Sequence, residues 1–265
     1  MQNINWKGSE YMLITERKFG ILKFANVYFA EEPGIVEIPD CDVVTYHTYK
    51  NCGIVKGFEK IDFFTTTIDL SHGLDEIWYK MKRQHRRHIR RAEKNGTIVT
   101  VSNNYEVFHQ IHKRFLKQKK YIDLAGIKIF PSKFMQKYGI LFIAENQGET
   151  LGGNLYYHDE HNALLICHAY QLTDNTIDRN KQIADANCYL HWEAMKYFKN
   201  MNIINYDLGG VLGSGSVPIN HKMHGFDYFK RSFGGKVIAQ YEYRKFKSHF
   251  NKLLFSFYNF LQSYI

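Results

Sequence analysis

The chain has 265 residues, with 35 Lys and Arg against 26 Asp and Glu, which gives a formal net charge of +9. Hydrophobic residues make up 45% of it, which excludes a disordered chain because so much apolar surface can offset the entropy of folding. No run of 18 apolar residues occurs and the N-terminus lacks the pattern of a secretory signal, so we expect neither a membrane-spanning helix nor a leader.

Cysteine and histidine give little sign of a metal or disulfide framework. The four cysteines form no Cys-x-x-Cys pair, which favours a reducing, cytoplasmic location. The His-x-x-His pair at 85/88 lies in a basic run, and the pair at 221/224 lies in a loop without acidic or Cys neighbours at ligand spacing. We therefore expect no metal site. The cysteines are Cys41, Cys52, Cys167 and Cys188.

The first part of the chain is rich in β-branched and aromatic residues, which predicts strands over 21–30, 41–50 and 60–70. A single helix is predicted over 72–94, and Asn95-Gly96 ends it. Many basic residues and only Glu93 as a nearby acid lie on the outer faces of this helix. Because like charges repel along a helix, a polyanionic partner and an ordinary solvated face both stay open.

The rest of the chain predicts a mixed sheet with helices on its faces. In such sheets the functional cleft lies at the carboxyl ends of strands. This places Tyr170, Gln171, Asp207 and the loop 209–216 around one crevice. The predicted strands are 97–102, 139–146, 149–159, 162–171, 202–208 and 236–243. The predicted helices are 104–120, 131–138 with Pro131 at its first position, 180–200, 225–232 and the amphipathic 245–264.

Several motifs recur together in one order over residues 70–240. They are the basic segment 81–96, Arg179 before a helix, Leu190-His191-Trp192 within it, Tyr206-Asp207-Leu208-Gly209-Gly210 at a strand end, and Phe229-Lys230-Arg231-Ser232-Phe233-Gly234. In this order they resemble the FemABX peptidyltransferases and their short relatives. The resemblance implies an α/β GNAT-like acyltransferase fold. Residues 1–95 would form a partial GNAT-like unit, and 96–265 the acyltransferase domain.

The resemblance implies transfer of an aminoacyl or acyl group to an amine of a cell-wall or related precursor, such as an amine-bearing sugar or peptide. The usual GNAT pyrophosphate loop is missing, and Arg179–Ala184 occupies its place. This favours aminoacyl-tRNA as the donor, with no tightly bound cofactor. Two alternatives stay open: an acyl-CoA-dependent N-acyltransferase acting on an amino sugar or nucleotide-linked sugar, and a non-catalytic tRNA- or polyanion-binding module.

The resemblance also suggests roles for single residues. Lys230 and the Phe229 amide would stabilise the oxyanion, although Lys230 can equally be one surface lysine among many. Asp207 would take a proton from the amine or, as we favour, anchor backbone amides. Predicted substrate-binding residues are Arg179, Tyr170, Tyr206, Gly209, Gly210, Lys222 and Arg231. Predicted tRNA contacts are Lys82, Arg83, Arg86, Arg87, Arg90 and Arg91.

The helix predicted over 245–264 has a Phe-rich face. Such a face either packs against the domain or docks on an anionic membrane surface, as amphipathic helices do. A peripheral membrane contact is therefore a second predicted partner. Lys222, Arg231 and Arg244 add positive charge to this part of the chain.

Overall fold

The computed structural model describes residues 12–119, 130–171, 176–211 and 225–262. Within these residues, ten strands form one mixed sheet in the order β1-β2-β3-β10-β4-β9-β8-β7-β6-β5. The strands are β1 Leu13–Phe19, β2 Leu22–Tyr28, β3 Val43–Thr48, β4 Glu59–Asp69, β5 Ile98–Ser102, β6 Ile140–Asn146, β7 Glu149–His158, β8 Asn162–Tyr170, β9 Asn205–Val211 and β10 Lys236–Phe246. The helices are α1 Leu74–Lys80, α2 Arg83–Lys94, α3 Tyr105–Lys119, α4 Ser132–Tyr138, α5 Ile177–Asn200, α6 Gly225–Arg231 and α7 His249–Gln262.

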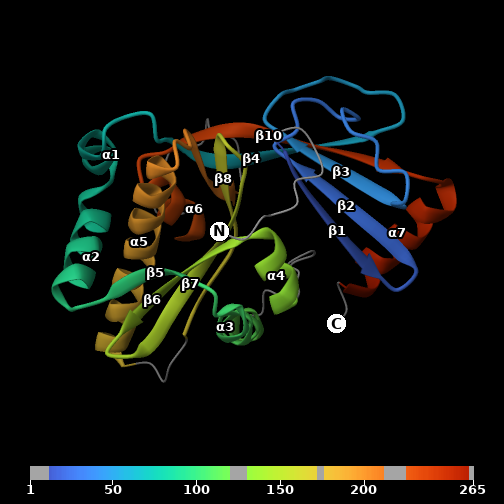
Figure 1. The fold of residues 1–265 in the computed structure, drawn as a ribbon. Coiled ribbons are helices and arrows are strands. Elements are labelled where there is room, and N and C mark those ends of the chain that lie inside the picture. Colours follow the sequence, from blue (N-terminus) through green and yellow to red (C-terminus); the bar gives the residue numbers. More distant parts are fainter. Residues whose placement is uncertain (1–11, 120–129, 172–175, 212–224, 263–265) are drawn as a thin grey trace.

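The sheet bends into two wings, which the long strands β4 and β10 connect (Figure 1). We call β1–β3 the N-terminal wing and β5–β9 the C-terminal wing. Most neighbouring strands are antiparallel, whereas β2–β3 and β8–β9 are parallel. Strand β10 comes from the predicted acyltransferase domain but pairs with β3 and β4, so both predicted segments share one sheet. The division of the chain at residue 95 stays a prediction.

Helices cover both faces of the C-terminal wing, and the alternation along β6 shows how. Phe142 and Ala144 face the cluster that contains α1, α2 and α5. Leu141 and Ile143 point the other way, into the cluster with α3 and α4. Because both faces are buried, the strand is apolar at successive positions. In the N-terminal wing, α7 packs on the sheet through Phe255.

The single helix predicted over 72–94 is wrong, because the structure has two helices, α1 and α2, in this range. Met81 between them has extended backbone angles (φ −66°, ψ 145°), and its side chain is buried. The backbone N–H of Lys82 donates to the Ser232 carbonyl at 2.9 Å. A tertiary contact therefore interrupts a segment whose residues favour a continuous helix.

The boundary predicted between strand 202–208 and a glycine loop is also wrong. Strand β9 continues to Val211, so Gly209 and Gly210 lie within it, and residues 212–216 lie outside the described residues. Gly209 has a φ of +80°, and the ladder with β4 shifts register between Thr65 and Thr67. This is a β-bulge, which needs a positive φ that glycine adopts without strain. Pro131 caps α4 rather than occupying its first turn.

Candidate active site

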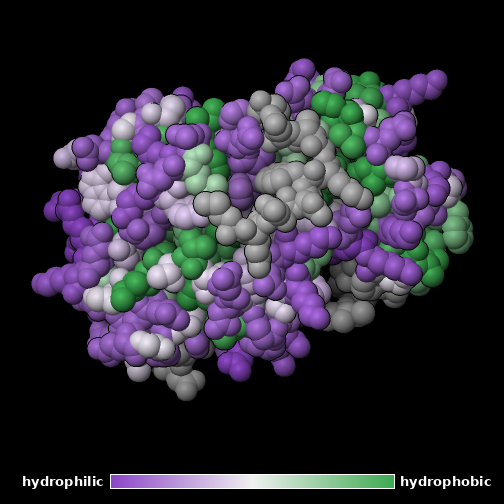
Figure 2. Space-filling model, viewed as in Figure 1, coloured by the Kyte–Doolittle hydropathy of each residue, from purple (hydrophilic) through white to green (hydrophobic). Residues whose placement is uncertain are grey.

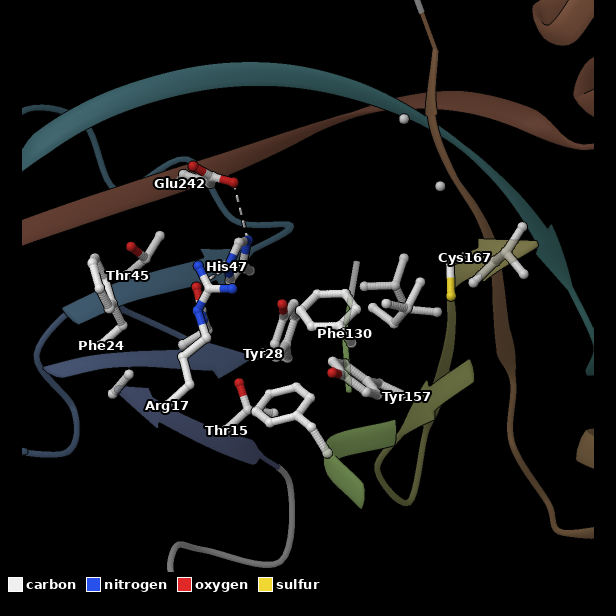
Figure 3. Close-up of a pocket in the computed structure, with 18 of the residues that line it drawn as sticks. Thr15, Arg17, Phe24, Tyr28, Thr45, His47, Phe130, Tyr157, Cys167 and Glu242 are labelled. Carbon is white, nitrogen blue, oxygen red and sulfur yellow. Dashed lines mark hydrogen bonds and ion pairs between the residues drawn. The ribbon is translucent and has the colours of Figure 1, made fainter. Parts of the chain in front are cut away.

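Two cavities flank strands β8 and β9, which pair only where Asn162–Leu164 meets Asn205–Asp207. The first cavity, of about 400 Å³, lies between the two wings, and Cys167, Gly209 and Gly210 form part of its wall (Figure 3). The second, of about 600 Å³, is lined by α2, α5 and α6, and Tyr170 at the end of β8 also borders it. Beyond Leu164 and Asp207 the two strands are not paired with each other, and both ligand-sized spaces adjoin this unpaired part.

The first cavity is polar on the side of the N-terminal wing. His47 stacks on Tyr28 with ring centroids 4.4 Å apart, and its Nδ1 lies 3.4 Å from Glu242 Oε1 (Figure 3). Arg244 pairs with the other oxygen of Glu242 at 3.0 Å. The Nε atoms of Arg17 and Arg244 are buried and, among the described residues, have no hydrogen-bond partner. Guanidinium, imidazole and carboxylate groups thus line one wall of a cavity that also contains aromatic rings.

Lys230 is not itself a lining residue of either cavity, but its neighbours belong to the walls of both. Its Nζ donates to the Gly210 carbonyl at 2.7 Å, and the neighbouring Phe229 lines the second cavity. Only 4% of Lys230 is exposed, and Nζ lies 4.1 Å from the centroid of the Phe226 ring. Burial lowers the pKa of Lys230 to about 8, against the opposing effect of Asp207 and Asp227. An ammonium with this pKa is charged at neutral pH and becomes neutral in mildly alkaline solution.

Asp207 anchors the bulge of β9. Its Oδ1 accepts the Gly209 backbone N–H at 2.7 Å and the Thr65 hydroxyl, and its Oδ2 accepts the Tyr49 hydroxyl at 2.8 Å. The side chain is fully buried, and burial raises its pKa while these hydrogen bonds and Lys230 act in the opposite direction. The geometry matches the anchoring role that we favoured. A role as proton acceptor is left as a prediction.

Solved structures share this architecture. No protein-family model matches the chain, and no curated protein matches its sequence. FemX is 12% identical with a TM-score of 0.57, over 93% of this chain and 86% of that one. The C-terminal domain of a putative lysylphosphatidylglycerol synthetase from Agrobacterium fabrum is 11% identical with a TM-score of 0.54, over 92% and 83%. L-PGS from Bacillus licheniformis is 14% identical with a TM-score of 0.53, over 92% and 84%.

The chain has the fold of FemX. The FemABX-like, GNAT-type fold predicted from the sequence is therefore confirmed. At 10–14% identity the likeness concerns the fold. The roles of individual residues follow from the geometry alone.

The predicted oxyanion pair is only partly brought to the crevice. The Lys230 ammonium contacts the strand corner formed by Gly209 and Gly210. Phe229 is the fifth residue of α6, where the backbone N–H of an α-helix bonds to the carbonyl four residues earlier. Its own carbonyl accepts a hydrogen bond from His85 Nε2 at 3.0 Å. The role of the Phe229 amide as the second oxyanion donor therefore stays a prediction.

The predicted substrate-binding residues separate into two groups. Tyr170 borders the second cavity, and Gly209 and Gly210 border the first. The Tyr206 side chain instead is fully buried, and its hydroxyl lies 2.8 Å from His191 Nδ1. Arg179 pairs with Glu149 and Gln182, which ties the start of α5 to β7. Arg231 is buried, and Lys222 lies outside the described residues.

The predicted tRNA-contacting residues lie on or beside α2. Arg91 makes two hydrogen bonds to Asp185 of α5, with Nε to Oδ2 at 3.0 Å and Nη2 to Oδ1 at 2.6 Å. Asp185 is buried, and His88 also contacts it. Arg91 is thus part of the α2–α5 contact. Lys82, Arg83, Arg87 and Arg90 are exposed, and Arg86 is half-buried.

The His-x-x-His pair at 85/88 is used in packing. His85 bonds to the Phe229 carbonyl and His88 to Asp185, and their rings are 6.5 Å apart. Among the residues that the structure describes, no group of three metal-binding side chains is found. The pair at 221/224 lies outside the described residues.

Sequence analysis did not identify Arg17, His47 and Tyr49 as site residues. Each lies on or next to a strand of the N-terminal wing, and the bend of the sheet brings that wing opposite β8 and β9 (Figure 1). Their side-chain types are ordinary for strands and turns. The fold of the wing places Arg17 and His47 in the wall of the first cavity and brings the Tyr49 hydroxyl to Asp207.

Proposed function

We propose that the chain is an aminoacyl- or acyltransferase whose donor and acceptor enter from opposite sides of β8 and β9. The observation that supports this most is the position of Lys230, a buried cation whose neighbours belong to the walls of two ligand-sized cavities. A cation at that point can stabilise the negative charge that develops on an attacked carbonyl, which is worth on the order of 3–4 kcal/mol. The shared fold of FemX and L-PGS supports the same reaction class.

Aminoacyl-tRNA is the donor that we propose, and the second cavity is its site. Gln84, His85 and His88 of α2 form part of the wall of this cavity. The exposed Arg83, Arg87 and Arg90, which we call the α2 arginines, lie on the same helix. Hydrophilic residues cover this part of the molecule (Figure 2). If the α2 arginines bind phosphates of the tRNA, the aminoacyl ester at its end would lie at the second cavity.

The acceptor would occupy the first cavity. Its aromatic rings and polar groups suit an amine-bearing sugar or peptide, as expected for a cell-wall or related precursor. The amine nitrogen attacks the ester carbonyl, and a C–N bond forms as the C–O bond to the tRNA breaks. The proton released by the amine ends on the leaving ribose oxygen. Holding both substrates in place supplies roughly 7–11 kcal/mol of the barrier reduction.

A donor panel tests the proposal. The protein is incubated with charged tRNAs and with acyl-CoAs, and loss of the acyl group is measured with and without amine acceptors. Amine-dependent deacylation of a charged tRNA, abolished by ribonuclease, is the expected result. Saturable acyl-CoA consumption instead would support the acyl-CoA-dependent N-acyltransferase. Tight RNA binding without turnover of any donor would support the non-catalytic tRNA- or polyanion-binding module. The exposed Lys236→Met is the matched control for Lys230→Met.

Peripheral membrane contact through α7 belongs to the same proposal. Phe250, Leu253 and Phe257 are 63%, 57% and 59% exposed and form one line along the helix, which we call the α7 stripe. Hydrophobic residues gather over this part of the molecule (Figure 2). None of the helices within the described residues is long and apolar enough to cross a bilayer. An exposed apolar stripe beside the exposed Lys247 suits the surface of an anionic bilayer.

A further inference from the structure

One hydroxyl group next to the N-terminal wing contacts the carboxylate that anchors the β9 bulge. Tyr49 directly follows β3, and its side chain is half-buried. Its hydroxyl donates to Asp207 Oδ2 at 2.8 Å, although 158 residues separate the two in sequence. The other oxygen of Asp207 is held by Thr65 of β4 and by the Gly209 amide. Three different segments thus fix one buried carboxylate.

Asp207 in turn fixes the position of Lys230. The carboxylate holds the Gly209 amide in the bulge, and the next residue, Gly210, accepts the Lys230 ammonium at 2.7 Å. A Cβ at Gly209 would lie 3.4 Å from Lys230 Nζ, so the bulge and the ammonium are in contact. A shift of the carboxylate would therefore move the carbonyl that orients Lys230.

Charges on every neighbouring element bear on this contact. Lys230 is faced by Asp207 of β9, Asp227 of α6, His168 of β8 and His191 of α5. Burial lowers the pKa of His168 to about 3 and lowers that of His191, so both rings are neutral at pH 7. The charge of Asp207 is consequently one of the few that can offset the burial of the Lys230 ammonium.

We propose that Tyr49 is a positioning residue of the transferase site: its hydroxyl holds the Asp207 carboxylate, and through the β9 bulge the Lys230 ammonium, in the reactive arrangement. The inference rests on the proposed function only in assigning Lys230 to the reaction. Tyr49 is not among the residues that line either cavity, although it packs against Tyr157 and Leu164 of the first cavity wall. It acts through Asp207, so its loss should affect turnover and the titration of Asp207 rather than donor binding.

Tyr49→Phe removes the hydroxyl and keeps the ring, and Tyr46→Phe is the matched control. Tyr46 lies on β3 and its hydroxyl donates to the Val36 carbonyl at 2.5 Å, away from Asp207. For Tyr49→Phe we expect kcat to fall about tenfold with an unchanged KM for the donor. The midpoint of the acidic limb of the pH–rate profile should move up by about 1 pH unit. A carboxylate that loses a hydrogen-bond donor binds its proton more tightly. Tyr46→Phe should change neither.

A second measurement does not depend on activity. The Asp207 carboxyl carbon is followed by ¹³C NMR in labelled protein, with Asp207→Asn to assign its signal. The midpoint of Asp207 should rise in Tyr49→Phe and stay at the wild-type value in Tyr46→Phe. An unchanged midpoint overturns the inference. If no donor is turned over by the wild type, the proposed function fails, and this titration still decides whether Tyr49 controls Asp207.

A double-mutant cycle separates positioning from general stabilisation. In the Asp207→Asn background, Tyr49→Phe should produce no further loss of kcat, because the two residues act in series. An equal fractional loss in both backgrounds would show that Tyr49 acts independently of Asp207 and would refute the inference. Circular dichroism on each variant restricts the comparison to folded protein.

Discussion

As pH rises above 8, deprotonation of Lys230 should stabilise the wild-type protein and lower its activity. Replacing Lys230 by Met should remove both effects. Lys230 Nζ is buried and bonded to the Gly210 carbonyl, and burial lowers its pKa to about 8 from the ordinary 10.5. Below pH 8 both the folded and the unfolded chain carry the charged lysine. Between pH 8 and 10.5 the unfolded chain binds more protons at this residue than the folded chain does. The free energy of unfolding therefore increases as pH rises through this range. Lowering the pKa of Lys230 from 10.5 to about 8 corresponds to a gain of about 3 kcal/mol in the free energy of unfolding across this pH range.

The measurement is the difference in unfolding free energy between wild type and Lys230→Met, from urea titrations at several pH values. We expect this difference to shift by about 3 kcal/mol in favour of the wild type between pH 7.5 and 10.5. Transfer should meanwhile decline as pH rises through 8, because the neutral amine no longer stabilises an oxyanion. At pH 7, Lys230→Met should lose about 10²–10³ in kcat. A flat stability difference, or near-normal turnover by the variant, would refute the reasoning.

The other predictions concern the bulge, the α2–α5 contact and the two surfaces. Gly209→Ala should be less stable by about 1 kcal/mol or more in thermal melts, since its φ is +80° and a Cβ would lie 3.2 Å from the Leu165 carbonyl oxygen. Gly210→Ala should be tolerated in the same assay, because the atom nearest to its Cβ would be 3.8 Å away. Arg91→Gln should lower the free energy of unfolding by about 2 kcal/mol in urea titrations, because it leaves buried Asp185 short of donors. Replacing one of the α2 arginines by Gln should reduce the salt dependence of tRNA binding by about one unit of slope in filter binding, with Lys236→Gln unchanged. Serine at all three positions of the α7 stripe should abolish sedimentation with phosphatidylglycerol vesicles; wild-type protein that fails to sediment, or that remains in solution as a dimer through this stripe, would contradict the membrane contact.

The order of the elements could be read from the sequence because most elements bury a periodic set of residues. The alternation in β6 and the spacing along α5 both survive in the packed clusters. The break at Met81 could not be read in this way. A buried Met and a basic neighbour favour a helix locally, and the opposing contact comes from Ser232, about 150 residues away.

The chemistry of a candidate residue depends on its partner, and the partner is often distant in the sequence. Arg91 belongs to a basic run, yet Asp185 of another helix neutralises it. Arg179 was expected to bind substrate, yet Glu149 pairs with it. Neither acid lies near its arginine in the sequence, so the neighbouring residues alone do not reveal the pairing. Lys230 was found through its motif, whereas the cavities that its neighbours line follow from the bend of the sheet.

The environment of Asp207 explains how a buried lysine can stay reactive. A carboxylate paired directly with an ammonium would neutralise it and hold it fully protonated. Asp207 instead receives hydrogen bonds from Tyr49, Thr65 and Gly209, and among the described residues no ion pair joins it to Lys230. The ammonium bonds to the neutral Gly210 carbonyl. Asp207 therefore contributes its charge at a distance, enough to keep Lys230 protonated near neutral pH, while the ammonium keeps a field that a developing oxyanion can use.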